Sequence, residues 1–303
     1  MQYDQTEDSE FQHILVFGPP KSGKTVLVGK LAEHFRLVWL DLDGGVKAIR
    51  NNVAPEFHKN IDVISMPDSK AFPVAIETTL KIFTGAPVRI CAKHGVHQCS
   101  ACVKDPGAAW TEFCLNTMED DQILVIDHAA QLSQSCTNFI TKGKGDDYKP
   151  DWDDWMKQGV LLDRIFSHIQ TGRYHCCVIT HEMGIEMEDG KEKLVPTCGT
   201  RNYSRTFAKF FDHIVYSELF NKKHKFTSST TGTLNALTGS RTNVALEKEQ
   251  DPELYMMFDK VRRTAQVAKT PSSPVAKPSP TTLSHQAASV LATLKPGQPV
   301  IKS

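Results

Sequence analysis

A glycine-rich segment near the start of the chain carries the residues best suited to chemistry. Residues 18–25 match the phosphate-binding pattern G-x-x-x-x-G-K-[ST] at every fixed position. The glycines let successive backbone N–H groups face a phosphate, and the start of a following helix adds positive potential. We expect Lys24 to contact the β- and γ-phosphates and the Thr25 hydroxyl to bind Mg²⁺. The predicted nucleotide-binding residues are Gly18, Pro19, Pro20, Lys21, Ser22, Gly23, Lys24 and Thr25.

A carboxylate at the end of a neighbouring apolar strand completes the expected magnesium site. Residues 122–126 are mostly apolar, and Asp127 follows where the strand would reach the carboxyl edge of a parallel sheet. A Mg²⁺ ion bound to phosphates needs such an acid. The alternative, an aspartate that only caps a turn, is less favoured beside a complete phosphate-binding loop.

Two acidic residues compete for the task of polarising the attacking water. Asp43 follows the apolar strand at residues 37–42, and period-two geometry puts Asp41 and Asp43 on the same side. Glu182 follows His181 after another apolar strand. We favour Asp43 as the water-polarising acid and His181 as the sensor of the γ-phosphate, with Glu182 as the competing acid. Either acid could instead be a solvated loop end.

A dense group of cysteines and histidines lies between residues 91 and 102. Its spacing, Cys-x2-His-x2-His-x-Cys-x2-Cys, offers five ligands, and tetrahedral Zn²⁺ requires four. Four protein ligands leave no open position, so a structural zinc site is expected rather than a catalytic one. A chance cluster of reduced thiols is the alternative. The predicted zinc ligands are Cys91, His94, Cys99 and Cys102, with His97 as the alternative nitrogen ligand and Cys114 as a distant reserve.

Short apolar runs and amphipathic stretches alternate along the chain, which predicts an α/β fold. Buried strands are predicted at residues 13–17, 37–42, 61–65, 122–126, 176–180 and 213–217. Helices are predicted at residues 24–35, 69–83 and 155–171. Continuous hydrophobicity is typical of strands covered on both faces, and the strand–helix–strand order favours a mainly parallel sheet flanked by helices.

Composition and charge exclude several classes of protein. The chain has 303 residues, and its 35 Lys and Arg balance its 35 Asp and Glu, which excludes binding to nucleic acid by bulk charge. No apolar run approaches the roughly 18–20 residues that cross a bilayer, and the first residues show no secretory signal. These features predict a cytoplasmic protein without a membrane partner. The cysteines expected to be buried core thiols are Cys136, Cys176, Cys177 and Cys198.

The domain organisation follows from changes in composition. Residues 13–263 are predicted to form one core domain, with the Cys/His group in an insertion at residues 86–114. Residues 1–12 are expected to be a flexible N-terminus. Residues 264–303 lack acidic and aromatic residues and are rich in Pro, Ser and Thr, so a disordered tail is predicted. An amphipathic stretch at residues 283–294 is a candidate for docking a partner.

Six motifs follow one another over roughly residues 13–262: GPPKSGKT at 18–25, LVWLDLDGG at 37–45, ILVIDHAAQL at 123–132, CVITHE at 177–182, SRTFAKFFDHIVY at 204–216 and TGSR at 238–241. In this order the motifs resemble the RecA-like branch of P-loop ATPases, and most of all the phage-encoded single-strand annealing proteins of the Sak type. The resemblance implies a RecA-type sheet, ATP as the nucleotide, and a site completed at the interface of a homo-oligomer.

The resemblance also implies roles for individual residues. Asp43 stands where RecA-like proteins keep a catalytic acid, usually Glu, and His181 stands where recombinases carry a Gln that senses the γ-phosphate. Arg241 stands where this branch offers a basic residue to a neighbour's ATP. A planar guanidinium there would stabilise charge in the transition state. Lys223 and Lys225 are weaker candidates for the same task.

DNA-binding loops in the resembled family follow the strands that end near Asp127 and His181. Here those segments are residues 133–154 and 183–201. The first mixes lysines with aromatic residues, a combination suited to single-stranded DNA, but a run of aspartates neutralises it. The second favours a hairpin over a DNA clamp. The candidate DNA contacts are Lys142, Lys144, Arg201 and Arg205.

The leading hypothesis is a Mg²⁺-dependent ATPase that binds single-stranded DNA, serves phage recombination or annealing, and changes its oligomeric state with ATP. The alternative is an ATPase of the same fold that loads or regulates a replication or recombination protein through its zinc insertion and tail. A small-molecule kinase would need an arginine-rich lid, which the sequence lacks. A GTPase is disfavoured because residues 221–224, Asn-Lys-Lys-His, lack the aspartate that contacts guanine.

Overall fold

The computed structural model describes residues 11–145, 147–187, 190–228, 235–241 and 253–258. The N-terminus predicted to be flexible, residues 1–12, falls almost entirely outside these ranges, and the predicted tail at residues 264–303 does so completely. Within the described ranges, no helix combines the length and the apolar character that crossing a membrane requires.

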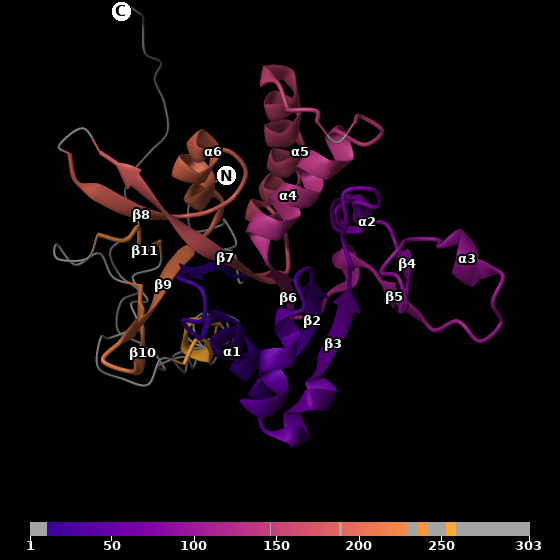
Figure 1. Cartoon of the computed structure of the whole chain (residues 1–303). Coiled ribbons are helices and arrows are strands. Elements are labelled where there is room, and N and C mark those ends of the chain that lie inside the picture. The colour runs from indigo at the N-terminus through magenta and orange to yellow at the C-terminus, as the bar shows by residue number, and fades with distance from the viewer. Residues whose placement is uncertain (1–10, 146, 188–189, 229–234, 242–252, 259–303) are drawn as a thin grey trace, which may run out of the picture.

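A central sheet of nine strands organises the described part of the chain (Figure 1). Its strands are β1 (His13–Gly18), β2 (Arg36–Asp41), β3 (Ile61–Ser65), β6 (Gln122–Asp127), β7 (His175–Glu186), β8 (Glu192–Pro196), β9 (His213–Phe220), β10 (Lys223–Thr227) and β11 (Gly239–Ser240). The main path runs β10-β9-β1-β7-β6-β2-β3. Neighbours from β9 to β3 are parallel, which confirms the mainly parallel sheet, and β8, β10 and β11 pair antiparallel.

The strand order decides which residues meet at the carboxyl edge of the sheet. β7 lies between β1 and β6, so two strand spacings of about 4.8 Å each separate the phosphate-binding loop from Asp127. His181, the register partner of Gly18, falls into this gap. On the other side of β6, β2 sets Asp41 opposite Asp127. The strand of Asp127 is therefore not the immediate neighbour of the loop strand, and His181 stands between them.

Helices cover both faces of the sheet. They are α1 (Lys24–Gly29), α2 (Val74–Ile82), α3 (Ser100–Val103), α4 (Ala129–Ile140), α5 (Trp152–Gln170) and α6 (Arg201–Phe207). Three predicted helix boundaries move by three residues or more. α2 starts after Pro73 rather than at residue 69, because proline favours extended chain before it. α1 ends at Gly29 rather than at residue 35, and the chain continues as a 3-10 turn. α5 starts three residues early because Asp151 and Asp154 form a capping box.

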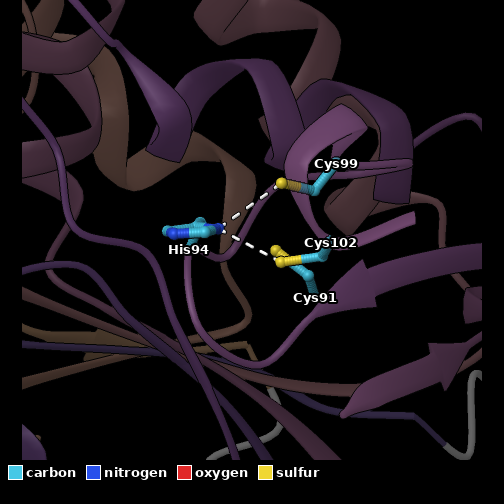
Figure 2. A group of neighbouring side chains, drawn as sticks. All are labelled: Cys91, His94, Cys99 and Cys102. Carbon is cyan, nitrogen blue, oxygen red and sulfur yellow. Dashed lines mark hydrogen bonds between the residues drawn. The ribbon is translucent and has the colours of Figure 1, made fainter. Parts of the chain in front are cut away.

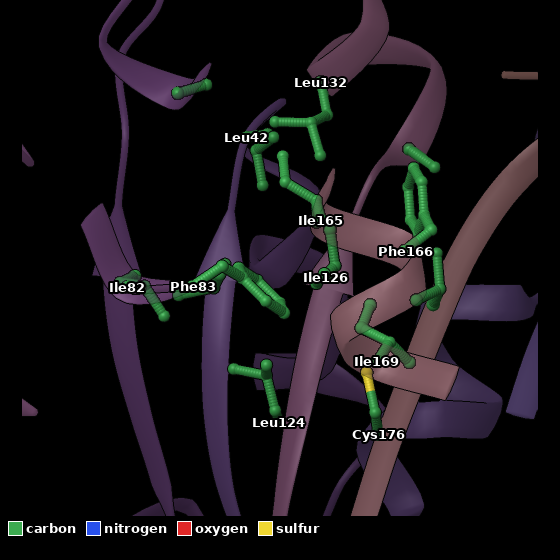
Figure 3. Close-up of a cluster of buried hydrophobic side chains, with 14 of the residues drawn as sticks. Leu42, Ile82, Phe83, Leu124, Ile126, Leu132, Ile165, Phe166, Ile169 and Cys176 are labelled. Atoms are coloured by element: carbon green, nitrogen blue, oxygen red, sulfur yellow. The ribbon is translucent and has the colours of Figure 1, made fainter. Parts of the chain in front are cut away.

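Alternate residues of the central strands face opposite sides of the sheet, and each side has its own core. On one side, Leu124 and Ile126 of β6 pack with α2, α4 and α5 (Figure 3). On the other side, Ile123 and Val125 pack with α1 and with Phe258. All four β6 residues are fully buried. Coverage of both faces explains why hydrophobicity along these strands is continuous.

The strand at residues 61–65 is the exception to the prediction of buried strands. β3 forms the end of the main path and pairs with β2 alone within the described residues. Asp62 and Ser65 are exposed, and Val63 is 42% exposed. An edge strand keeps one side open, and a charged residue such as Asp62 discourages pairing with another chain.

A second, two-stranded sheet occupies the segment predicted as an insertion. β4 (Val88–Cys91) pairs antiparallel with β5 (Trp110–Phe113), and α3 lies in the connection between them. Figure 1 shows this unit projecting from the main sheet beside α2. The Cys/His group therefore lies beside a different sheet from the one that carries the nucleotide-binding loop, although Val88 and Ile90 of β4 pack in the main core.

Candidate nucleotide site and metal centre

The phosphate-binding loop follows β1 in a conformation that requires glycine at positions 18 and 23. Gly18, Lys21 and Gly23 have positive φ angles of 152°, 63° and 93°. A Cβ on Gly18 would lie 1.9 Å from the carbonyl oxygen of Ser217, so glycine is required between β1 and β9. Gly23 is the N-cap of α1, so the helix start and its N–H groups follow directly from the loop.

Lys24, the first residue of α1, is held inside this loop. Its Nζ donates to the carbonyl oxygens of Gly18 at 3.0 Å and Pro19 at 2.7 Å. Burial lowers the pKa of Lys24 to about 8. Nearby carboxylates, Asp127 most strongly, act in the opposite direction and raise this pKa. Phosphate oxygens would be stronger partners for this ammonium group than neutral carbonyls. The lysine is therefore placed to exchange its loop contacts for a phosphate.

Two residues of the β9–β10 hairpin brace the loop. Ser217 Oγ donates to the Ser22 carbonyl at 2.8 Å, and His224 Nδ1 lies 2.7 Å from the same oxygen. A Cβ on Gly23 would lie 2.8 Å from His224 Nδ1, so the hairpin packs directly on the loop. Sequence analysis missed both contacts because they depend on strand order.

Three aspartates converge at the carboxyl ends of β2 and β6. Carboxylate oxygens of Asp41, Asp43 and Asp127 lie within 4.8 Å of one another. The Gly45 N–H donates to Asp43 Oδ1 at 2.9 Å. A Cβ on Gly45 would lie 2.9 Å from both Asp127 Oδ2 and Asp43 Oδ1. The missing side chain at Gly45 therefore keeps the space beside these two acids clear.

The charge state of these aspartates fits a bound cation. Asp127 is 1% exposed, and its Oδ2 makes no hydrogen bond within the described residues. Burial, together with the charges of Asp43 and Asp41, raises the pKa of Asp127 to about 8. Burial also raises the pKa of Asp41. Mg²⁺ prefers hard oxygen ligands and would offset this repulsion, so the residues present fit that ion.

Two histidine rings lie near the aspartates and Lys24. His181 is on β7, His128 follows β6, and their ring centroids are 3.9 Å apart. His181 Nδ1 and His128 Nε2 are buried without a hydrogen-bond partner within the described residues. Burial lowers the pKa of His128 to about 3 and also lowers that of His181, and the charge of Lys24 adds to both shifts. Both rings are therefore neutral at pH 7. Sequence analysis named only His181.

The two acids that compete for water activation lie in different surroundings. Asp43 is exposed and belongs to the aspartate cluster. Glu182 is half-buried and accepts a hydrogen bond from the Tyr216 hydroxyl at 2.8 Å. Both acids act electrostatically on Lys24. Both therefore remain candidates for polarising a water molecule beside the loop lysine.

The Cys/His cluster converges in the insertion, as Figure 2 shows. Cys91, His94, Cys99 and Cys102 place their ligand atoms within 4.8 Å of one another. His94 Nδ1 lies 3.4 Å from Cys99 Sγ and 3.3 Å from Cys102 Sγ. The three thiols are buried, and the Cys102 backbone N–H lowers the pKa of Cys99, which favours the thiolate that binds metals. Three sulfurs and one imidazole nitrogen form a donor set that structural Zn²⁺ uses.

His97 and Cys114, the alternative zinc ligands suggested by the sequence, lie outside this cluster. The backbone of His97 forms a bridge with Ile90, and the buried Nδ1 of His97 has no hydrogen-bond partner within the described residues. Cys114 Sγ lies 3.5 Å from the Gly85 carbonyl oxygen. The structure thus brings His94, and not His97, to the cysteines. The four cysteines expected in the core, Cys136, Cys176, Cys177 and Cys198, are all buried.

The loop of the Cys/His cluster packs against the carboxyl end of β3. Gly95, next to His94, has a φ of 66°, and a Cβ there would lie 2.3 Å from the Ser65 carbonyl oxygen. Thr78 Oγ1 on α2 donates to the Gly95 carbonyl at 2.7 Å. Ser65 pairs in register with Asp41 on β2. The cluster and the aspartates are therefore connected through the end of one strand.

Arg241 lies at the opposite edge of the sheet from the phosphate-binding loop. β11 pairs with the first residues of β9, with Ser240 beside His213. Arg241 Nη1 lies 3.3 Å from Asp212 Oδ1, and Nη2 donates to the Lys209 carbonyl at 2.8 Å. The structure does not bring Arg241 to the nucleotide site of its own chain, and a contact with a neighbour's site stays a prediction.

The segment at residues 133–154, expected as a DNA-binding loop, is helical over its first part because α4 continues into it. Lys142 pairs with Glu77 at 2.9 Å, and Lys144 pairs with Asp154 at 3.2 Å. Both candidate DNA contacts are therefore engaged within their own chain.

The segment after His181 forms a β7–β8 hairpin, as the sequence favours, and borders a cavity of about 690 Å³. Arg205 of α6 lines the cavity, and Arg201 is exposed one helical turn away. The lining combines apolar and charged side chains, among them Ile185, Val195, Leu237, Lys193, Arg205 and Glu192.

Two solved structures show distant similarity to the chain. One is described as an ATPase domain, at 11% identity and a TM-score of 0.34, covering 78% of this chain and 80% of that one. The other is a prototypical ATPase from the type III secretion system of pathogenic bacteria, at 11% identity and a TM-score of 0.35. It covers 70% of this chain and 51% of that one. These similarities are too distant to bear on function.

A family model gives the decisive match. No curated protein matches the sequence. Residues 10–274, however, match the model of the AAA_24 family, described as an AAA domain. The matched range contains the phosphate-binding loop, the three converging aspartates, and the histidine pair His128 and His181. The chain therefore belongs to this AAA domain family of P-loop ATPases.

Proposed function

We propose that this protein is a Mg²⁺-dependent ATPase of the RecA-like type that acts on single-stranded DNA in phage recombination or annealing. The observation that carries the proposal is the convergence of a lysine, three aspartates and two neutral imidazoles at one edge of the sheet. Phosphoryl transfer needs such groups, because its catalysis rests on positioning and on stabilising charge.

The phosphates and the metal ion are held by separate groups. The loop amides and Lys24 bind the phosphate oxygens, which replace the carbonyl oxygens that Nζ contacts here. Thr25, Asp127 and Asp41 would hold Mg²⁺, which when bound neutralises charge on the phosphates. Asp127 then loses the proton that its raised pKa lets it keep near neutral pH.

His181, Asp43 and Glu182 are the residues that we assign to the terminal phosphoryl group and the attacking water. His181 lies between the loop and the aspartates, where its neutral ring donates to the terminal phosphoryl group. Asp43 polarises the water, with Glu182 as the competing acid. The experiment that tests the reaction is Mg²⁺-dependent ATP turnover by the full chain. We expect Lys24→Ala to lower turnover by about 100-fold or more, since a lost charge-stabilising donor costs this much.

A matched control is Lys30→Ala, which removes an exposed lysine from the turn after α1. Its turnover should equal that of the wild type. A wild-type protein that neither binds nor hydrolyses ATP in the presence of Mg²⁺ would refute the proposed function.

We infer that single-stranded DNA binds beside the β7–β8 hairpin. The support is the cavity of about 690 Å³, whose lining joins cationic and apolar side chains. The cations Lys191, Lys193 and Arg205 outnumber the acids Glu186 and Glu192, and Ile185, Val195 and Leu237 supply the apolar surface. Cations for phosphates and apolar surface for bases are the two components of sites that bind single strands without sequence preference. Residues 133–154 are less suited, because Lys142 and Lys144 are already paired with carboxylates.

Arg205→Glu tests this surface. We expect the affinity for an oligothymidine to fall about tenfold and the salt dependence to weaken by about one counterion. Lys142→Glu is the control, since Lys142 already pairs with Glu77, and should change affinity less than about twofold. Equal losses in the two variants would place the DNA elsewhere.

We also propose that ATP links neighbouring copies of the chain through Arg241. This arginine is distant from its own loop, and its side chain is 53% exposed although it pairs with Asp212. Arg241→Ala should lose turnover, and mixing it with Lys24→Ala should restore part of it, because each variant lends an intact half-site. Absence of this rescue would count against a shared interface.

Zn²⁺ is the metal we propose for the Cys/His cluster. The support is three thiols and one imidazole nitrogen within 4.8 Å of one another. Elemental analysis of the full chain should find about one zinc per chain, as expected of a four-ligand structural site. Cys99→Ser should lose the metal, while Cys114→Ser, in the same insertion but outside the cluster, should keep it. A metal-free wild type grown with zinc would contradict the assignment.

The projection of the insertion beside α2 (Figure 1) favours a second candidate function, loading or regulating a replication or recombination protein. Single-stranded DNA separates the two. An annealing ATPase should bind it in a salt-dependent way and hydrolyse ATP faster in its presence. A loader should do neither without its partner.

A further inference from the structure

Three buried polar atoms near Lys24 lack a partner within the described residues. They are Asp127 Oδ2, His181 Nδ1 and His128 Nε2. Buried polar atoms are nearly always hydrogen-bonded, so several unpartnered ones in one place indicate a ligand. The proposed ATPase already gives roles to Asp127 and His181. It gives none to His128.

The position of His128 follows from the order of the strands. It is the residue directly after β6, and β6 is the neighbour of β7, which carries His181. His128 is 4% exposed, and its ring centroid is 3.9 Å from that of His181. The two rings touch, yet neither of the two unpartnered nitrogens donates to the other. The His181 ring also interacts with the Gly18 backbone, so the Nε2 of His128 is the nitrogen left to meet a ligand.

We propose that His128 is a second residue that contacts the terminal phosphoryl group of ATP, with Nε2–H donating to a phosphate oxygen beside His181. The inference rests on the proposed ATPase function and deepens it. The His128 ring contacts His181, the register partner of Gly18 in the phosphate-binding loop, so it lies one side chain away from that loop.

The physical effect of such a contact is largest in the transition state. A neutral donor fixed in a buried site stabilises negative charge on the transferring group without any reorganisation of solvent. It adds little to the binding of ADP, which has no terminal phosphoryl group at this place. A histidine that only packs against His181 would instead affect all bound states alike.

His128→Leu and His128→Gln test the contact in the full chain. We expect His128→Leu to lower kcat about 30- to 100-fold with KM for ATP within about threefold, because a transition-state donor is lost. His128→Gln should recover most of kcat, since its amide nitrogen reaches about as far as Nε2. His168→Leu, which removes a half-buried histidine of α5, should leave turnover unchanged.

Ligand affinity gives a readout that a merely structural role would not move. His128→Leu should bind ADP with fluoroaluminate, an analogue of the transferring phosphoryl group, at least about tenfold more weakly than the wild type, while ADP alone changes less than about twofold. Equal losses for both ligands, or none, would overturn the inference. If His128→Leu does not fold, His128→Asn replaces it, and equal activity of the Asn and Gln variants is the overturning result.

Different results would refute the proposed ATPase function and the proposed role of His128. A wild type without ATP turnover ends the ATPase proposal itself. A wild type with normal turnover, matched by a folded His128→Leu, ends only the role of His128.

Discussion

The nucleotide site and the Cys/His cluster are assembled in opposite ways. The nucleotide site takes Lys24, Asp41, Asp127 and His181 from β2, β6, β7 and the loop after β1, which lie far apart in sequence and meet only at the sheet edge. The Cys/His cluster takes all four ligands from residues 91–102. One site depends on the strand order of the whole domain, and the other on a short local segment.

The two sites also differ in whether their buried polar atoms have hydrogen-bond partners. The nucleotide site holds Asp127, His128 and His181 with unpartnered atoms, which is unfavourable until a ligand arrives. In the cluster, His94 Nδ1 and two cysteine sulfurs already lie within hydrogen-bond distance. We conclude that the nucleotide site lowers the stability of the ligand-free protein in order to bind its ligand. The Cys/His cluster, in contrast, is built to hold a metal ion at all times. The following predictions test that contrast.

Asp127→Asn should produce the largest effect. It removes one of the two carboxylates proposed to hold Mg²⁺, so turnover should fall about 100-fold or more, the scale expected when a metal contribution of several kcal/mol is lost. The same change should stabilise the protein without nucleotide. Folding places a proton on Asp127, whose pKa burial raises to about 8, while the unfolded chain releases it above about pH 4.

The raised pKa of Asp127 determines how its contribution to folding stability changes with pH. The contribution of Asp127 to stability is fully present below about pH 4 and is lost as pH rises through about 8. Asparagine stays neutral throughout, so the variant should melt several degrees above the wild type at pH 8, with the gap narrowing toward pH 5. Thermal melts without nucleotide or added Mg²⁺ measure this. A gap that is the same at both pH values would contradict it.

Loss of zinc should have a strong but local effect. Cys102→Ser should release the metal and loosen α3 and β5, because the cluster and its partner Trp110 form their own small core. Amide hydrogen exchange should become fast in residues 99–113 and stay slow in the main sheet and in β4, whose Val88 and Ile90 pack in the main core. ADP affinity should stay within about threefold of the wild type. Simultaneous loss of protection in β1 and β6 would show that the two sites are not separate.

Gly95→Ala should reveal how far the sites are nevertheless coupled. The added Cβ would lie 2.3 Å from the Ser65 carbonyl oxygen, at a φ of 66° that alanine rarely adopts. We expect a stability loss of about 1–3 kcal/mol and a few-fold drop in turnover, because β3 ends beside Asp41. Gly107→Ala, in the same insertion but without a close backbone contact, should change neither.

The smallest expected effect concerns the water-polarising acid. Tyr216→Phe removes the hydroxyl that donates to Glu182 at 2.8 Å. If Asp43 polarises the water, as we propose, turnover should change less than about threefold, as for a hydrogen bond of about 1 kcal/mol outside the reaction. A drop of tenfold or more in steady-state turnover would transfer the role to Glu182.

The same contrast explains what could be predicted from the sequence. The phosphate-binding loop and the Cys/His spacing are contiguous, so their residue types identify them directly. Ser217, His224 and His128 could not be identified, because their contacts arise from the pairing of β9 with β1, β10 with β9 and β6 with β7. β3 resembles a buried strand in composition, and only its place at the end of the sheet exposes it. Helix starts moved where Pro73 and Asp151 act locally.

The length of β7 carries one strand from the nucleotide site to the cavity. As far as Ile179 this strand pairs with β1 on one side and β6 on the other, and from Glu182 onward it pairs with β8. At about 3.3 Å per residue, Glu186 lies about 16 Å beyond His181. Ile185 on this extension is buried and lines the cavity of about 690 Å³. The register partner of Gly18 and part of the cavity lining therefore belong to one continuous strand.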